Sequence, residues 1–158
     1  MSSPVRECSA ANALEVVGER WALLALREVF FGVHRFDQIQ RNTGASRDVL
    51  AARLRSLVAA GLLERVPYEQ HPPRWEYVLT DTGRDLQAVL LTLMAWGDRH
   101  LAADGPPTVL RHSCGAVLVP RTVCAHCGDE VRSGEATLVQ TRWREKPARS
   151  ARGTVHTP

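Results

Sequence analysis

Four residues in the C-terminal third of the chain have the types and the spacing of metal ligands. His112 and Cys114 form one pair, and Cys124 and Cys127 form a second pair after nine intervening residues. A glycine follows each pair, and glycine lets the backbone bend around an ion. Three thiolates and an imidazole match the tetrahedral ligand set of a structural zinc ribbon. The sequence therefore predicts one structural Zn²⁺ per chain.

Other chemistry remains open for these residues. Cys124 and Cys127 also have the spacing of a redox dithiol, or they stay as reduced thiols without a ligand. His126 is a substitute ligand, although a residue between two coordinating cysteines normally points outward. The segments Ala116 to Val119 and Ala136 to Gln140 are predicted to form the ribbon strands. A module this small has little core, so metal binding would supply its folding energy.

A zinc enzyme is not expected. A deaminase-like site needs a His-x-Glu sequence and a proline directly before its C-x-x-C pair. Ser113 and Cys114 follow His112, and Val123 precedes Cys124. Four protein ligands also leave no open position for a reactive water. We therefore predict no catalytic residues.

A second kind of chemistry comes from arginine. The net charge of +3 is small, and residues 142–158 alone contribute +4, so the remaining 141 residues carry −1. Within that nearly neutral part, residues 35–65 are locally basic. The six arginines there are Arg35, Arg41, Arg47, Arg53, Arg55 and Arg65. This zone predicts a phosphate-contacting surface inside a folded domain rather than a generally basic protein.

Membrane association is not expected. The longest uninterrupted apolar run, Trp21 to Leu26, has six residues, whereas a spanning helix needs about 20. No charged-then-apolar leader opens the chain, so we expect a cytoplasmic protein.

Helical patterns dominate the first sixty residues. A short helix follows Ser9 as its expected N-cap and is interrupted at Gly18. A second, mostly buried helix spans 20–31, and a third spans 35–42 before a tight turn at 43–45. Ser46 caps a fourth helix that runs to about Ala60. Its apolar stripe is Leu50, Leu54, Leu57 and Val58.

A hairpin and a long helix follow. Residues 62–68 and 74–79 are predicted strands, joined by a polar tip at 69–73 that is not expected to enter a sheet. Thr80 caps a helix predicted to reach about Ala103. Asp104 to Pro107 indicates a linker. The expected domains are therefore 8–103, a zinc-ribbon-like module at 104–141, and a basic, disordered tail at 142–158.

This order of elements predicts a mainly α fold with a small β part, a winged helix-turn-helix. The helix after Ser46 would enter the DNA major groove by its N-terminal end. The alternative is that its arginines form a solvated face paired with Asp48 or glutamates. The expected DNA contacts are Arg35, Ser46, Arg47, Asp48, Ala51, Ala52, Arg55, Arg65, His71 and Arg74.

Many residues along the chain follow the spaced pattern of a known family. The pattern begins at Cys8, followed by Ala13 to Gly18 with Arg20 and Trp21, then Leu26 to Glu28 and Gly32. It continues with Arg35 to Ile39, Ser46-Arg47, Leu50, Arg53-Leu54, Leu57, Gly61-Leu62, Glu76 to Thr80 and Gly83. With these residues the chain resembles the HxlR-type regulators. The resemblance covers about residues 8–101, and the chain departs from it at Glu19, Ala45 and Trp75. It implies a homodimeric bacterial transcription regulator, expected to be a repressor at a palindromic operator.

The resemblance also implies a role for Cys8. It matches a cysteine that some members use to sense oxidants or electrophiles; the alternative is a buried or frayed cysteine.

The apolar face of the long helix is larger than one small domain needs, which predicts a contact with a second subunit. Leu90, Leu93 and Trp96 on this helix are the expected dimer seam, with packing inside one subunit as the alternative. A small-molecule effector is not identified. The rival function is a protein-interaction adaptor without specific DNA binding.

Overall fold

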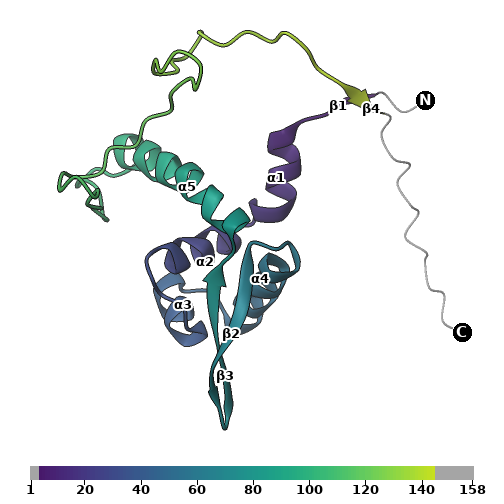
Figure 1. Cartoon of the computed structure of the whole chain (residues 1–158), viewed down its shortest axis with the longest axis vertical. Coiled ribbons are helices and arrows are strands. Elements are labelled where there is room, and N and C mark those ends of the chain that lie inside the picture. Colours follow the sequence, from purple (N-terminus) through teal and green to yellow (C-terminus); the bar gives the residue numbers. More distant parts are fainter. Residues whose placement is uncertain (1–3, 145–158) are drawn as a thin grey trace, which may run out of the picture.

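A computed structural model describes residues 4–144 and confirms a mainly α winged helix-turn-helix fold (Figure 1). The elements in chain order are β1 (Val5–Arg6), α1 (Ser9–Val17), α2 (Arg20–Phe30), α3 (Phe36–Thr43), α4 (Arg47–Ala59), β2 (Leu63–Gln70), β3 (Pro73–Leu79), α5 (Asp81–His100) and β4 (Trp143–Arg144). None of the helices in this part of the chain is both long and apolar enough to cross a bilayer.

The core forms where α2, α3 and α4 meet. Leu50, Leu54 and Leu57 are completely buried, so the predicted stripe of α4 is confirmed. They pack with Leu26 of α2 and Ile39 of α3. This packing fixes which face of α4 stays free, because a helix that buries one stripe presents the opposite side to solvent.

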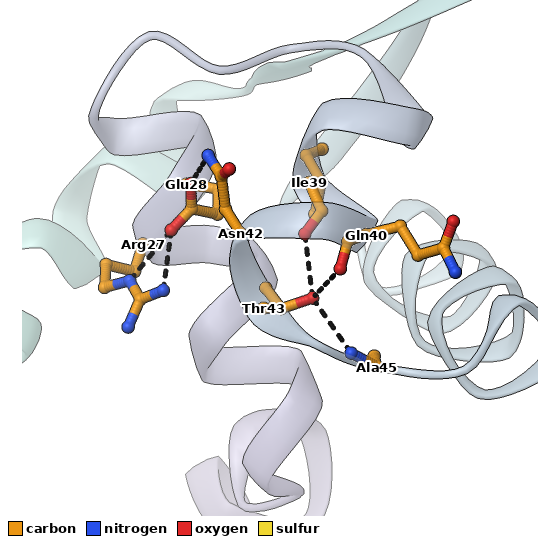
Figure 2. Close-up of polar contacts among 7 residues, drawn as sticks. All are labelled: Arg27, Glu28, Ile39, Gln40, Asn42, Thr43 and Ala45. Carbon is orange, nitrogen blue, oxygen red and sulfur yellow. Dashed lines mark hydrogen bonds and ion pairs between the residues drawn. The ribbon is translucent and has the colours of Figure 1, made fainter.

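The turn between α3 and α4 is as tight as the sequence predicts. Gly44 has a positive φ of 74°, a backbone conformation that favours glycine. The Thr43 hydroxyl donates to the Ile39 carbonyl at 2.8 Å and accepts from the Ala45 N–H at 3.4 Å (Figure 2). Ser46 Oγ then accepts from the Val49 N–H at 3.4 Å, which caps α4. These local bonds set the angle at which α4 leaves α3.

A buried carboxylate joins α2 to the end of α3. Glu28 is only 4% exposed. Its two oxygens accept from Arg27 Nη2 at 2.6 Å and from Asn42 Nδ2 at 2.7 Å (Figure 2). A buried carboxylate is costly unless it is paired. Arg27 belongs to α2 itself, so the bond from Asn42 is the one that constrains α3 against α2.

The wing is longer than predicted. β2 and β3 pair antiparallel from Leu63↔Leu79 out to Gln70↔Pro73, so Glu69, Gln70 and Pro73 belong to the strands. The prediction that 69–73 stays outside the sheet is wrong. Pro73 opens its strand, where its missing N–H removes no interior ladder bond. Only His71 and Pro72 remain as the tip, and a register irregularity lies between Pro67 and Glu69.

Two helix ends differ from the predictions. The N-cap of α1 is Cys8 rather than Ser9, without a side-chain capping bond. The Thr80 cap of α5 is confirmed, since its Oγ1 accepts from the Gly83 N–H at 3.0 Å. The helix ends at His100, short of Ala103. Gly105, with a positive φ of 88°, lies in the linker beyond this end.

Residues 104–142 form no compact layer and are mostly exposed. Residues 136–140 make no strand, which corrects the predicted ribbon; Val139, for example, is 94% exposed. Residues 143 and 144 belong to the tail that the sequence predicts to be disordered, but they form an ordered strand. Trp143 and Arg144 pair with Val5 and Arg6, and the Arg6 guanidinium lies 5.3 Å from the Trp143 ring centroid. The rest of that tail lies outside the described residues.

Candidate nucleic-acid interface

A basic groove of about 650 Å³ lies between the helix-turn-helix and the wing. Figure 1 shows the β2–β3 hairpin extending past α3 and α4, away from α1 and α5. The groove collects five arginines: one from the residue before α3, and one each from α3, α4, β2 and β3. They are Arg35, Arg41, Arg47, Arg65 and Arg74.

Arg47 is the first residue of α4, directly after the Ser46 cap. Its Nη1 lies 2.9 Å from Asp37 Oδ1, and its guanidinium lies 5.0 Å from the centroid of the Phe36 ring. Both charged side chains are exposed. The unpaired N–H groups at a helix N-terminus favour an anion at the same place, so Arg47 and the helix end attract phosphate together.

Arg35 connects α3 to the wing. Its Nε lies 3.2 Å from Glu76 Oε1, its backbone forms a bridge with Glu76, and its guanidinium lies 4.5 Å from the Tyr68 ring centroid. Next to it, the Tyr77 N–H donates to the His34 carbonyl at 2.9 Å. These contacts hold the hairpin at a fixed position relative to the helices.

The wing arginines are held by aromatic rings and carboxylates. The Arg65 guanidinium lies 4.6 Å from the Trp75 ring centroid, and Arg74 Nε lies 3.3 Å from Glu69 Oε2. A hydrogen bond that the Arg74 guanidinium donates to Tyr68 and the negative charge of Glu69 raise the pKa of Arg74. His71 is exposed at the tip. The wing thus presents cations along its length.

The α4 residues predicted to contact DNA lie on the side of the helix that the core leaves free. Ser46, Arg47, Asp48 and Arg55 are exposed, and the small side chains Ala51 and Ala52 are half-buried beside them. None of the ion pairs found within residues 4–144 involves Arg53 or Arg55. The predicted alternative, in which these two arginines pair with acidic side chains, is therefore absent from the described chain.

Several surface residues were not singled out from the sequence. Val49 is exposed in the first turn of α4, where its methyl groups can contact an apolar base edge. Gln38, Tyr68 and Trp75 line the groove together with the arginines. The position of Tyr68 and Trp75 close to Arg65 and Arg74 in the sequence was the available signal, but strand pairing is what brings the rings and the guanidinium groups together.

The ion pairs in the groove are weak enough for DNA phosphates to replace their carboxylates. Exposed pairs such as Arg47–Asp37 contribute roughly 0–1 kcal/mol. A phosphate that replaces the carboxylate forms a charge-assisted bond of similar geometry. The carboxylates therefore hold the arginine side chains in place at little energetic cost to DNA binding.

The predicted zinc ligands lie in two separate turns. Cys8, Cys114, Cys124 and Cys127 are all exposed and free. Within residues 4–144, no three His, Cys, Asp or Glu side chains are gathered in a metal-binding arrangement. Backbone hydrogen bonds from Cys127 and His126 lower the pKa of the Cys124 thiol, which favours the thiolate, the reactive and ligating form.

The predicted seam residues divide into two groups. Leu90 is buried by its own chain, at 6% exposure, whereas Leu93 and Trp96 are 50% and 49% exposed. Leu14 and Val16 of α1 are exposed as well. The packing of Leu90 inside the subunit follows from its position on the side of α5 that faces the domain.

Comparisons with known proteins agree with this geometry. The HxlR-like helix-turn-helix family model matches residues 16–104. An HTH-type transcriptional regulator of Mycobacterium tuberculosis, Rv3095, is 53% identical over 131 residues, which cover 82% of this chain and 83% of the relative. A Bacillus subtilis regulator, YtcD, is 35% identical over 94 residues, covering 59% of this chain and 75% of the relative.

Solved structures show the same fold. The crystal structure of the transcription factor PA1607 superposes with a TM-score of 0.74 at 31% identity, covering 84% of this chain and 94% of that one. The redox regulator HypR in its oxidized form superposes with a TM-score of 0.54 at 31% identity, over 58% of this chain and 96% of its own. This chain therefore belongs to the HxlR-like helix-turn-helix family and is a DNA-binding transcriptional regulator.

Proposed function

We propose that the protein binds a palindromic double-stranded DNA operator as a homodimer, represses transcription there and catalyses no reaction. This role implies a cytoplasmic location, where bacterial DNA lies. The observation that carries the proposal is the groove in which arginines from α3, α4 and the wing converge. The N-terminus of α4 would enter the major groove, and the wing arginines would contact flanking phosphates. The adaptor alternative offers no explanation for this convergence.

Base recognition is assigned to the exposed face of α4. Arg47 and Arg55 can donate two hydrogen bonds each to guanine, and Val49 can contact a thymine methyl group. Arg35, Arg65 and Arg74 would hold the register through phosphate. The two kinds of contact predict different effects of mutation on affinity and on sequence preference.

Arg47→Ala and Arg55→Ala are each expected to weaken operator binding by about 1–3 kcal/mol, because alanine cannot hydrogen-bond to the guanine edge, and to relax the preferred sequence. Binding is measured by gel shift on an operator selected from random duplexes. Arg121→Ala is the matched control, because Arg121 is an exposed arginine in an ion pair with Glu130 outside the winged domain. Unchanged binding by both α4 variants would refute the assignment of this helix.

The homodimer is supported by exposed apolar side chains on two helices, α1 and α5. Val89, Leu93 and Trp96 of α5 and Leu14 and Val16 of α1 are all more than 40% exposed. Both helices extend from the side of the domain opposite the wing tip (Figure 1). A second copy that covers these surfaces would leave both wings free. Such a pair would read two half-sites roughly 34 Å apart.

Replacing Trp96 with aspartate is expected to cost about 2 kcal/mol or more of dimerisation free energy, since tryptophan residues dominate interface energies. Sedimentation over a protomer dilution series should show that the variant dimer dissociates at a protomer concentration about 30-fold higher than the wild-type dimer does. The exposed polar Gln87 provides the control Gln87→Asp on the same helix. A monomeric wild-type chain at high concentration would contradict the proposal.

We propose Cys8 as a site of modulation. It is the exposed N-cap of α1, beside the proposed dimer surface. A hydroperoxide would oxidise its thiolate to a sulfenic acid with release of an alcohol or water. Condensation with a second thiol would then form a disulfide and release water. A change at α1 would alter the spacing of the two α4 helices. The likeness to a protein described as a redox regulator supports this role.

A further inference from the structure

Residues 110–131 form two short hairpins of the same design. In the first, Arg111 bridges to Val117, and the Leu118 N–H donates to the Leu110 carbonyl at 2.8 Å. In the second, Val123 bridges to Glu130, and the Val131 N–H donates to the Thr122 carbonyl at 2.9 Å. This equivalence is not evident from the sequence, because the two segments share few residues.

The turns of the two hairpins place the candidate ligands at equivalent points. Gly115 and Gly128 close the turns with positive φ angles of 92° and 81°. The Gly115 N–H donates to the His112 carbonyl at 2.9 Å, and the Gly128 N–H donates to the Cys124 carbonyl at 2.8 Å. In each turn one candidate ligand directly follows the bridge residue, and a cysteine directly precedes the glycine.

This equivalence accounts for the unequal spacing of the two pairs. Five residues separate the bridge partners Arg111 and Val117, and six separate Val123 and Glu130. The first turn is therefore one residue shorter, and His112 occupies the place that Cys124 has in the second. An imidazole is longer than a thiol side chain, and this extra length would offset the shorter turn in a site shared by both hairpins.

No hydrogen bond or ion pair joins the two hairpins among residues 4–144. Their backbone hydrogen bonds run within one hairpin or the other, and none crosses between them among the described residues. Leu110 and Leu118 of the first lie against Leu91 and Met94 of α5 around a small cavity. The second has exposed apolar residues only, Val123 and Val131. Segments of this size need a metal or a disulfide to hold together.

We propose that one zinc ion binds His112, Cys114, Cys124 and Cys127 and fastens the two hairpins to each other. The thiolates and the imidazole suit Zn²⁺, and four protein ligands make the site structural. His112 Nδ1 accepts a long hydrogen bond of 3.3 Å from the Cys114 N–H, which coordination would replace. The ion would fix residues 104–142 between the end of α5 and the β1–β4 pair. This inference is independent of DNA binding.

The test is the zinc content of the full-length chain, expressed with zinc and freed of any tag. Native mass spectrometry should show one zinc ion per chain, and denatured protein should release one equivalent to a colorimetric chelator. Cys127→Ser and His112→Ala should each lower the bound zinc well below one equivalent. Their matched controls are Cys8→Ser, a cysteine outside the module, and His126→Ala, a histidine within the second turn. Both controls should retain the full equivalent.

A second measurement distinguishes the removal of a ligand from misfolding of the chain. Hydrogen exchange should show residues 110–131 losing protection in Cys127→Ser and on chelation, while α2 and α4 stay protected. Zinc-free wild-type protein after metal-replete expression would overturn the proposal. So would a Cys124–Cys127 disulfide in place of zinc under reducing conditions. Full retention of zinc by His112→Ala would overturn the assigned ligand set.

Discussion

Operator affinity is expected to fall roughly 10³–10⁵-fold when monovalent salt rises from about 50 to about 200 mM. The groove of each protomer holds five arginines, Arg35, Arg41, Arg47, Arg65 and Arg74, so a dimer brings up to ten to the phosphates. Each phosphate that is neutralised releases condensed counterions, and added salt opposes that release. Fluorescence anisotropy of a labelled operator, titrated at several salt concentrations, gives the slope.

Single arginine variants make this expectation specific. Arg65→Ala should reduce the salt slope by about two per dimer, one for each copy, and weaken binding similarly on all sequences. Arg47→Ala should in addition change the preferred sequence, because it lies at the end of α4 that would face the bases. Arg121→Ala should leave the slope as in the wild type. A slope near zero for the wild type would mean that the groove does not contact phosphates.

Gly83→Ala is expected to destabilise the fold by about 3 kcal/mol, at the upper end of the usual cost of overpacking. Gly83 is buried in the first turn of α5, and an added Cβ would lie 2.1 Å from the Leu62 carbonyl oxygen. That oxygen also accepts the Thr80 N–H at 3.2 Å. The obstacle is backbone, so α5 would have to move away from the corner between α4 and β2. Urea unfolding at a fixed protomer concentration measures the change.

Gly97 supplies the control on the same helix. Apart from its chain neighbours and the backbone of its own helix, no atom lies within 4 Å of the Cβ that Gly97→Ala would add. Alanine is the better helix former, so this variant should gain up to about 1 kcal/mol. If the two glycine-to-alanine substitutions change the free energy of unfolding in opposite directions, packing rather than helix propensity decides the effect at Gly83. Equal stabilities of the two variants would show that α5 does not dock on Leu62 as described.

The local features of the helix-turn-helix could be predicted from the sequence with good accuracy. The leucine stripe of α4, the Ser46 and Thr80 caps and the Gly44 turn each depend on residues within one turn of helix. Short-range patterns were less informative at element ends. The α1 cap fell on Cys8, α5 ended at His100, and the wing extended to Gln70 and Pro73. Pairing energy from the opposite strand decided the length of the wing.

The residues available for chemistry can be read from the sequence alone: the basic zone at 35–65, the free face of α4 and the two ligand pairs. How these residues are grouped depends on the three-dimensional fold. The fold places Arg35 beside Glu76 and Tyr68, and Arg65 over Trp75. It also buries Leu90, pairs β4 with β1, and makes His112 equivalent to Cys124. These outcomes depend on contacts between residues far apart in the chain, which periodicity and spacing cannot encode.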